Sequence, residues 1–344
     1  MAGHNSLSSR LYRGELSIDF LGRRRLWYTI SAVLIALALV GIFARGLNTS
    51  VEFSGGNDFR VQVPASSSAG QQDVRAAIAG LSVPGASNPT VSTLTGNGTS
   101  IRVTTAETTP ADTGRIQNAL AKAVGAKPGD VSVSSIGASW GRDITRTAVT
   151  SLIVFLVLVM AYLALAFEWR MGLAAIISLI HDLLITVGIY ALVGFEVSPA
   201  TVIGVLTVLG YSLYDSVVVF DKVRENTRNI RARSDTTYTM SANLALNQTL
   251  VRSINTTIIA LLPIVSILLI GTFVLGPGVL QDLSLALTIG LTVGAYSSIF
   301  LATPLLAQLR ERDPAMIAVR NRYTAAHANA DNTDATATTV GARA

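Results

Sequence analysis

The long apolar stretches of this sequence restrict its fold more than any other feature. Four of them contain no charged residue and no histidine, and they lie at 26–44, 147–167, 253–280 and 283–309. Two further apolar segments, 171–195 and 197–220, are interrupted only by His181, Asp182 and Asp215. A helix needs about 20 mostly apolar residues to cross a hydrocarbon core ~30 Å thick, since each residue advances it by about 1.5 Å. The sequence therefore predicts six membrane spans.

The low charge content also favours a membrane protein over a soluble one. Only 14% of the residues are charged, whereas soluble domains carry about 25% charged residues. Six buried helices of this kind in a soluble protein of 344 residues would leave too little polar surface to cover them. The chain contains no cysteine, which excludes disulfide bonds and thiolate metal sites.

The net charge of +5 is distributed unevenly along the chain. Residues 1–25 hold five arginines against two acids, and residues 221–252 hold six basic residues against three acids. The short connections 194–199 and 274–281 hold no lysine or arginine. Basic loops are retained in the cytoplasm, so we expect both termini and 221–252 to be cytoplasmic and 45–146 to lie outside. Because the excess charge follows topology, no nucleic-acid partner is expected.

The segment 45–146 has the composition of an ordinary globular domain and a readable pattern. Val51–Val63 alternates like a strand, Gln71–Leu81 and Ala111–Val124 have helical spacing, and Val131–Ile136 is a further strand. Residues 91–94 and 100–104 form a predicted hairpin around Gly-Asn-Gly. The order β-α-β-β-α-β is typical of a ferredoxin-like domain.

The predicted fold class is therefore a membrane all-α six-helix bundle with an extracytoplasmic α+β ferredoxin-like domain between spans 1 and 2. The tail is Ala-, Thr- and Asn-rich and predicted to be disordered. The predicted segments, in order, are the cytoplasmic N-terminus 1–25, span 1 at 26–44, the extracytoplasmic domain 45–146, span 2 at 147–167, span 3 at 171–193, span 4 at 198–220, the basic cytoplasmic loop 221–252, span 5 at 253–274, span 6 at 283–307 and the cytoplasmic tail 308–344.

Asp215 is the first candidate for function, because an ionisable group inside a span costs several kcal/mol and normally faces the bundle interior. It lies six residues before Asp221, about 9 Å inside the predicted cytoplasmic end of span 4. Tyr211 and Ser212 precede it by one turn on the same helix face. Burial favours the protonated form of a carboxyl and a nearby cation favours the ionised form, so Asp215 is suited to load and release a proton. The alternative is a carboxylate that only fixes helix packing.

Arg252 opens span 5, with Gln248, Asn255 and Thr256 at helical spacing around it. Spans 4 and 5 are antiparallel neighbours, so Arg252 is expected within ion-pair reach of Asp215, holding it ionised in one state and releasing it in another. The alternative is an arginine that anchors the helix end at the membrane surface.

His181 and Asp182 lie about 17 Å along span 3 from Arg170, close to the membrane midplane. They are candidates for a second position on a proton path, although neighbouring side chains point about 100° apart and cannot both face one partner. The alternative is an aspartate that bridges helices beside a neutral histidine. Small residues in spans 4 and 6 predict close helix approach, namely Gly204, Gly210, Ser212, Ser216, Gly290, Gly294, Ser297 and Ser298.

The sequence contains no Walker A loop, no dinucleotide glycine fingerprint, no His-Glu-x-x-His and no nucleophile elbow. Neither ATP-driven transport nor hydrolysis has support from its motifs. No enzyme activity, metal or cofactor is therefore expected, and any energy should come from an ion gradient.

Four motifs occur in the order found in one known family. They are Phe-Ser-Gly-Gly at 53–56, Phe-Glu-Trp-Arg at 167–170 with Ile-His-Asp at 180–182, the stretch GYSLYDSVVVFDKVREN at 210–226, and LNQTLVRS at 246–253. Over residues 10–310 the chain resembles the SecF family of the bacterial Sec pathway, within the RND superfamily. It departs from the family pattern at Tyr214, where the family usually has Asn.

The resemblance implies a subunit that pairs with SecD in a pseudo-symmetric twelve-helix assembly, of which this chain is half. Such an assembly, in the bacterial plasma membrane and among its lipids, acts on exported polypeptides with the SecYEG channel and SecA, and uses the proton motive force. By position, Asp215 matches the family's proton-carrying aspartate and Arg252 the arginine of the same pathway, and His181 and Asp182 match a further motif. The remaining motif positions are Gly55, Gly56, Tyr211, Asp221, Gln248 and Asn255.

Two other functions stay open on the residues alone. A half of an RND-like lipid or drug exporter would carry a larger exported domain and a duplicated set of spans. A scaffold or assembly factor would use its buried charges only to set helix packing.

Overall fold

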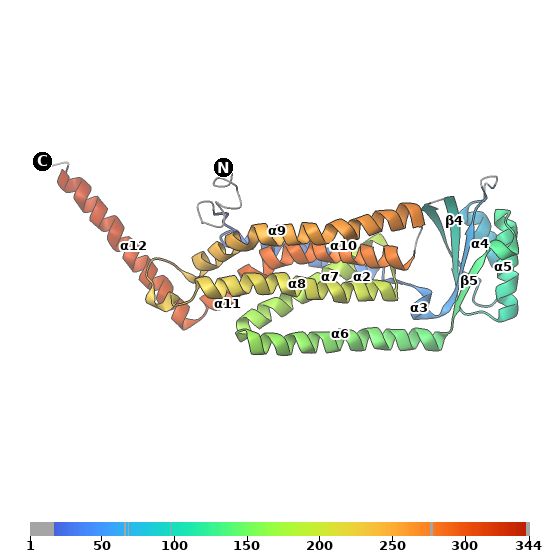
Figure 1. The fold of residues 1–344 in the computed structure, drawn as a ribbon, viewed down its shortest axis with the longest axis horizontal. Helices are drawn as coiled ribbons and strands as arrows, with labels where there is room; N and C mark the ends of the chain where they lie inside the picture. The colour runs from blue at the N-terminus through green and yellow to red at the C-terminus, as the bar shows by residue number, and fades with distance from the viewer. Residues whose placement is uncertain (1–16, 65–66, 68, 97, 276–277, 342–344) are drawn as a thin grey trace.

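The computed structural model describes residues 17–64, 67, 69–96, 98–275 and 278–341. The structure is elongated, with a helical bundle carrying a small α+β domain at one end (Figure 1). We call the end beside this domain, where α8 begins, the domain end, and the opposite end, where α12 begins, the tail end. Most of the N-terminal segment 1–25 lies outside the described residues.

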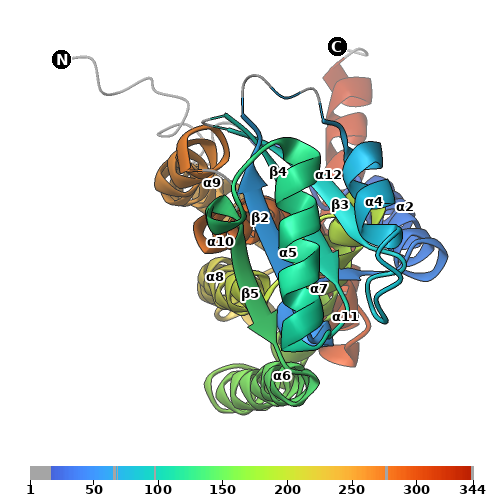
Figure 2. The same ribbon diagram turned by 90° about the vertical axis from the view of Figure 1, so that its right-hand side faces the viewer.

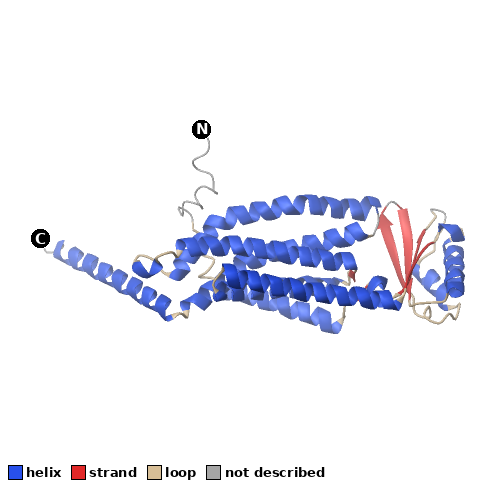
Figure 3. Ribbon diagram, turned by 60° about the horizontal axis from the view of Figure 1, so that its bottom comes forward, coloured by secondary structure: helices blue, strands red, loops and turns tan. Residues whose placement is uncertain are grey.

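Six helices are long and apolar enough to cross a membrane, as the sequence predicts. They are α2 (Arg24–Ala44), α6 (Ala138–Ala166), α7 (Trp169–Val193), α8 (Pro199–Asn226), α9 (Tyr238–Ile270) and a sixth that runs through α10 (Val279–Ser297), the π-helical turn η4 (Ser298–Ala302) and α11 (Thr303–Glu311). They run side by side along the long axis (Figures 1 and 3). Large apolar side chains on α6 and α9, among them Leu165 and Ile259, face outward, as lipid contact requires.

Several helices continue well beyond the predicted spans, because a span was bounded by its first charge and a helix is not. The α6 helix begins nine residues before position 147, and α8 continues to Asn226. The α9 helix begins at Tyr238, so the predicted loop 221–252 is two helix extensions joined by a short connection that contains the 3-10 helix η2 (Ile230–Ala232). Span 5 ends in the π-helical turn η3 (Gly271–Leu275).

In the tail, for which the sequence predicted disorder, the structure has the helix α12 (Pro314–Gly341). Asp313 caps its first turn by accepting a hydrogen bond from the Ala315 amide (3.2 Å), and proline suits the first helical position. Met316 and Val319 are buried. Alanine-rich composition favours a helix once such a cap and an apolar contact are present.

The domain between α2 and α6 has the predicted ferredoxin-like order. Its strands are β2 (Gly56–Gln62), β3 (Thr90–Gly96), β4 (Gly98–Thr105) and β5 (Ser132–Ile136), and its helices are α4 (Gln71–Ala79) and α5 (Pro110–Val124). The antiparallel sheet has the order β3-β4-β2-β5. Both helices cover the face turned away from the bundle (Figure 2). Between them and the sheet lies a separate core that includes Phe59, Ile78 and Ile116.

The strand predicted from Val51 begins only at Gly56, because Val51–Ser54 form a short helix, α3. Two glycines make the corner between α3 and β2: Gly55 has φ +74° and Gly56 has φ +134°, values that side-chain-bearing residues rarely adopt. A Cβ on Gly56 would lie 2.2 Å from the Thr105 carbonyl oxygen. The glycine pair therefore turns the chain and lets β2 enter the sheet.

Close helix contacts use three of the four predicted glycines. A Cβ on Gly204, Gly290 or Gly294 would lie 3.0 Å or less from a side-chain carbon across the α8–α10 contact, whereas nothing lies within 4 Å of a Cβ on Gly210. The α2–α7 contact is equally tight at Gly188, which the sequence did not single out.

Candidate functional site

Asp215 lies about 24 Å along α8 from its first residue, well inside the bundle. Two serine hydroxyls from two other helices donate to its carboxylate, Ser253 of α9 to Oδ1 (2.7 Å) and Ser298 of η4 to Oδ2 (2.5 Å). An ionised carboxylate has only acceptors, which both hydroxyls match. Asp215 therefore joins three helices through one side chain.

Asp182 of α7 is held in the same way and is 1% exposed. Its Oδ2 accepts hydrogen bonds from Ser212 of α8 (2.5 Å) and from Ser297 of α10 (2.8 Å). His181 Nδ1 is hydrogen-bonded to Asp182 Oδ1 (3.1 Å), so these neighbours contact each other and do not reach a common partner. His181 Nε2 is buried and has no hydrogen-bond partner among the described residues.

The two carboxylates form two neighbouring clusters that share α8 and the sixth span, while α9 takes part in the Asp215 cluster and α7 in the Asp182 cluster. Ser212 and Asp215 are one turn apart on α8, and Ser297 and Ser298 are adjacent where α10 passes into η4. Each cluster therefore uses one side chain of α8 and one serine of the sixth span. Ser212 does not serve Asp215, as its place on the helix suggested, but the aspartate of the other cluster.

The predicted ion pair between Arg252 and Asp215 is not formed in this structure. Arg252 Nη2 donates to the Tyr214 hydroxyl (3.2 Å), and both side chains are exposed. The next residue, Ser253, reaches Asp215 instead, because consecutive helical side chains diverge by about 100°. Arg252 makes no ion pair with any residue that the structure describes.

Four predicted motif residues line one cavity of about 1150 Å³ between α8 and α9 at the tail end. They are Asp221, Gln248, Arg252 and Asn255. Asn226 donates a hydrogen bond to Gln248 Oε1 (3.0 Å), which ties the end of α8 to α9. Tyr211 is exposed on α8 outside this cavity, and Gly55 and Gly56 lie at the domain end.

The sequence indicated Ser297 and Ser298 only as small residues for packing, placed Ser212 beside Asp215, and did not single out Ser253. In the structure all four donate hydrogen bonds to a buried or half-buried carboxylate. The feature of the sequence that could have indicated this role is a hydroxyl inside an otherwise apolar span, at the level where a neighbouring span carries an acid. Helix spacing alone does not say which serine meets which carboxylate.

A second charged cluster joins the ferredoxin-like domain to the bundle. Arg102 of β4 binds Asp58 of β2 (2.9 Å) and forms a two-point ion pair with Glu196, which lies in the short strand β6 (Glu196–Val197) just before α8. Beside it β6 pairs in parallel with β1 (Asn48–Thr49), at the end of α2. These contacts fix the domain to the segment that starts α8.

The charges of this cluster perturb one another. Burial disfavours the Arg102 cation, but its hydrogen bonds to Asp58 and Glu196 outweigh burial and raise the pKa of Arg102. Burial raises the pKa of Glu196 more than the nearby Arg102 lowers it. The described residues contain no group of three or more acids or histidines arranged to hold a metal ion.

Comparison with known proteins identifies the family to which the chain belongs. Residues 116–312 match the family model of the C-terminal part of the protein export membrane proteins SecD and SecF. The chain is 47% identical over 328 residues to the protein translocase subunit SecF of Streptomyces coelicolor, covering 95% of this chain and 86% of the relative. It is 42% identical to SecF of Mycobacterium tuberculosis, covering 90% of this chain and 71% of the relative.

A solved structure is also similar. The crystal structure of SecDF from Thermus thermophilus, described as a translocon-associated membrane protein, matches with a TM-score of 0.77 and 28% identity. The match covers 90% of this chain and 40% of that longer one. Extent and identity together identify the family: this chain belongs to the SecF protein translocase subunits of the SecD/SecF family.

Proposed function

We propose that the chain is the SecF subunit of a proton-driven export motor, in which protonation of Asp215 changes how α8, α9 and the sixth span pack. The observation that carries this proposal is that the half-buried Asp215 carboxylate accepts hydrogen bonds from two serine hydroxyls of two different helices and makes no ion pair with any residue that the structure describes. A carboxylate bound by fixed cations would stay ionised, whereas one held by hydroxyls accepts a proton more readily.

The serine hydroxyls also allow the helix contacts to change when Asp215 is protonated. When Asp215 gains a proton on Oδ2, that oxygen becomes a donor and a weaker acceptor, so the hydrogen bond that Ser298 donates to it is weakened. Ser298 already has a second acceptor, the Ala295 carbonyl at 3.2 Å. Turning to that carbonyl releases the bond between α8 and the sixth span while the backbone of η4 stays hydrogen-bonded.

Arg252 is proposed as the cation that completes the cycle. It sits one residue from the Ser253 that holds Asp215, and its partner Tyr214 is the neighbour of Asp215. In the other state of the cycle, Arg252 is proposed to exchange Tyr214 for the Asp215 carboxylate. The cavity beside Arg252, with Asp221, Gln248 and Asn255, provides a polar approach from the tail end.

The conformational change is proposed to reach the ferredoxin-like domain through α8. This helix runs unbroken from Pro199 to Asn226, and Ser198 caps its start by accepting the Thr201 amide. Glu196 lies just before the cap and binds Arg102 of the ferredoxin-like domain. A shift of α8 is thereby passed to the domain, which handles the exported polypeptide.

The partner assembly follows from the family. SecDF of Thermus thermophilus carries the SecD and SecF parts in one chain, of which this chain matches 40%. Exposed side chains of α8, Tyr211 and Tyr214 among them, are proposed to face SecD. The assembly is proposed to act with the SecYEG channel after SecA-driven translocation, with the tail end in the bacterial cytoplasm and without a metal or organic cofactor.

The test is export of a reporter protein into inner-membrane vesicles that contain this chain and SecD, with and without a protonophore. Asp215→Asn should abolish the part of export that depends on the gradient, and Asp215→Glu should retain some of it. The exposed Asp235→Asn is the matched control for the same chemical change. Normal gradient-driven export by Asp215→Asn, at normal abundance, would refute the motor function.

The scaffold function is the second candidate, because both aspartates are satisfied by hydrogen bonds between helices and could act only as ties. Co-purification of SecD with the same variants distinguishes the scaffold function from the motor function. If Asp215→Asn loses SecD together with export, the scaffold function is favoured. If SecD stays bound and only the gradient-dependent part is lost, the motor function is favoured.

A further inference from the structure

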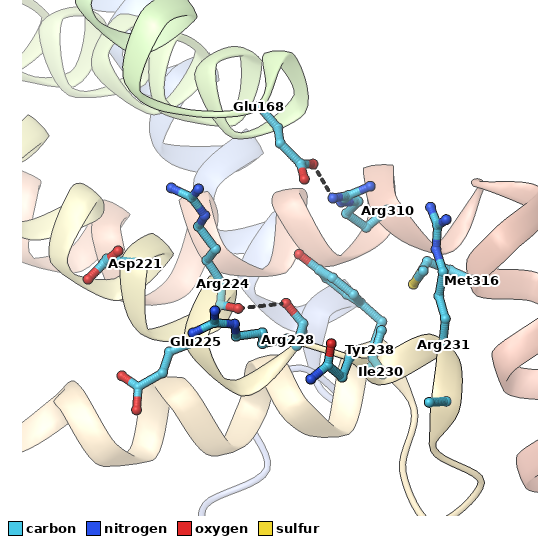
Figure 4. Close-up of a pocket in the computed structure, with 13 residues that line it drawn as sticks. Glu168, Asp221, Arg224, Glu225, Arg228, Ile230, Arg231, Tyr238, Arg310 and Met316 are labelled. Atoms are coloured by element: carbon cyan, nitrogen blue, oxygen red, sulfur yellow. Dashed lines mark hydrogen bonds and ion pairs between the residues drawn. The ribbon is translucent and has the colours of Figure 1, made fainter.

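A polar cavity of about 850 Å³ lies at the tail end, apart from both aspartate clusters. Its walls come from four places: the turn before α7, the end of α8 with η2, the first residue of α9, and the junction of α11 with α12. Figure 4 shows Arg224, Arg228, Arg231, Tyr238 and Arg310 around this hollow. The cavity gathers guanidinium groups from segments that are far apart in the sequence.

Three of these arginines have no acidic partner. Arg224, Arg228 and Arg231 make no ion pair with any residue that the structure describes. The acids Asp221 and Glu225 line the same cavity but lie at one end of it (Figure 4), and Glu225 binds Lys222 (3.0 Å). The lining of the cavity holds four arginines against the three acids Glu168, Asp221 and Glu225, and this excess of positive charge attracts an anion.

The fourth arginine marks the inner wall. Arg310 binds Glu168 and lies over the Tyr238 ring, with its guanidinium carbon 5.8 Å from the ring centre. The Tyr238 side chain is nearly buried, yet neither its hydroxyl nor Arg310 Nε has a hydrogen-bond partner of good geometry among the described residues. The Tyr238 hydroxyl, in the wall of the cavity, is therefore a donor for an oxygen of a bound anion, whereas Arg310 is already paired with Glu168 and Asp313.

The α12 helix is tied to this connection, since Arg322 donates a hydrogen bond to the main-chain carbonyl of Arg231 (2.5 Å). The cavity is also at the right depth for a membrane surface: Glu168 lines it, and the next residue, Trp169, is exposed and stands where aromatic side chains meet lipid headgroups.

We propose that this cavity binds a phosphate-bearing anion, and that the phosphate is supplied by the headgroup of an anionic phospholipid. Guanidinium forks from several directions match the oxygens of a phosphate better than those of a single carboxylate. The volume exceeds that of one phosphate and accommodates a headgroup with its glycerol. Bound lipid would tie the connection 227–237 to α12. This proposal relies on the proposed orientation only for the choice of leaflet.

The experiment is native mass spectrometry of the full chain in detergent, titrated with phosphatidylglycerol, with phosphatidylcholine, and separately with inorganic phosphate. The double variant Arg228→Gln/Arg231→Gln should need at least about tenfold more phosphatidylglycerol for the same adduct. The control is Arg233→Gln, which removes one positive charge from the same connection, where the double variant removes two, at a side chain that does not line the cavity and is paired with Asp235. It should bind as the wild type does.

Tyr238→Phe provides a second variant that should fold normally, because the hydroxyl has no well-formed partner to lose. It should weaken phosphatidylglycerol binding several-fold and leave thermal stability in lipid-free detergent unchanged. Equal binding of phosphatidylcholine, or an equal loss in the Arg233→Gln control, would overturn the site. Saturation by low-millimolar inorganic phosphate with no preference for phosphatidylglycerol would overturn the lipid source and assign the cavity to a soluble phosphate compound.

Discussion

Replacing Gly188 by alanine should separate α2 from α7. A Cβ at this position would lie 2.2 Å from Ala38 Cβ and 2.4 Å from Ala38 Cα, whereas carbon atoms in contact are about 3.5–4.0 Å apart. Because one of the two blocking atoms belongs to the backbone, no rotamer change relieves the clash. The α2 helix must withdraw by more than an ångström, and overpacking of this kind costs about 1–3 kcal/mol.

Gly210→Ala is the matched control, since nothing lies within 4 Å of a Cβ at that position. Both substitutions raise helix propensity by up to about 1 kcal/mol, and this gain cancels when the two variants are compared. The expected difference in unfolding free energy is therefore the overpacking cost alone, or roughly tenfold in the unfolding equilibrium for each 1.4 kcal/mol.

The assay is denaturant unfolding of both variants in the same detergent, followed by far-UV circular dichroism. Gly188→Ala should unfold at the lower denaturant concentration with an unchanged slope. If the two variants are equally stable, the α2–α7 contact is looser than the structure shows, and the close-packing argument fails for this pair.

Three further changes test the charged and hydroxyl contacts. Arg102→Met removes the cation that two carboxylates share and should lower the unfolding free energy by about 2–3 kcal/mol. The more exposed Arg60 is the comparison, and Arg60→Met should lower the unfolding free energy by less than about 1 kcal/mol. Equal losses of the two variants in urea unfolding would contradict a role for burial. Because burial raises the pKa of Glu196 above its ordinary value of 4.5, this carboxyl contributes stability that is complete below that value and is lost as pH rises through the raised pKa. Glu196→Gln should remove this part of the pH dependence of thermal unfolding, and an unchanged profile would argue against it. Ser298→Ala leaves Asp215 with one hydroxyl donor and should slow gradient-driven export by about two- to tenfold, so undiminished export would contradict the hydroxyl switch.

The spans and the ferredoxin-like domain could be predicted because their signals are local. An apolar run long enough to cross a membrane is compatible with few structures. In the domain, apolar residues recur every 2 residues in strands and every 3.6 residues in helices, which indicates the order of these elements. The helix ends could not be predicted, because a helix that leaves the membrane continues in water as long as its own residues allow. The corner at Gly55 and Gly56 was missed for a related reason: alternation from Val51 looks the same whether or not a glycine turns the chain.

At the candidate site, the sequence could predict that the carboxyl groups lie inside the bundle, but it could not predict which side chains bind them. A carboxyl inside a span signals an interior position, which Asp182 and Asp215 both occupy. Which hydroxyl each carboxyl meets depends on the rotation of several helices about their axes, a tertiary property that one sequence does not encode locally. Arg252 shows the same limit, because its place on α9 predicted a contact with Asp215, whereas its side chain contacts the neighbouring Tyr214.

The π-helical turn η4 has a thermodynamic consequence for the two aspartates. Ser297 and Ser298 are joined by one peptide bond, yet they hold carboxylates that belong to different helices. The two carboxylates are thus held through adjacent residues at the start of one π-helical turn, a widened stretch of backbone. Under the proposed function, a proton gained by one acid would change the free energy required to protonate the other.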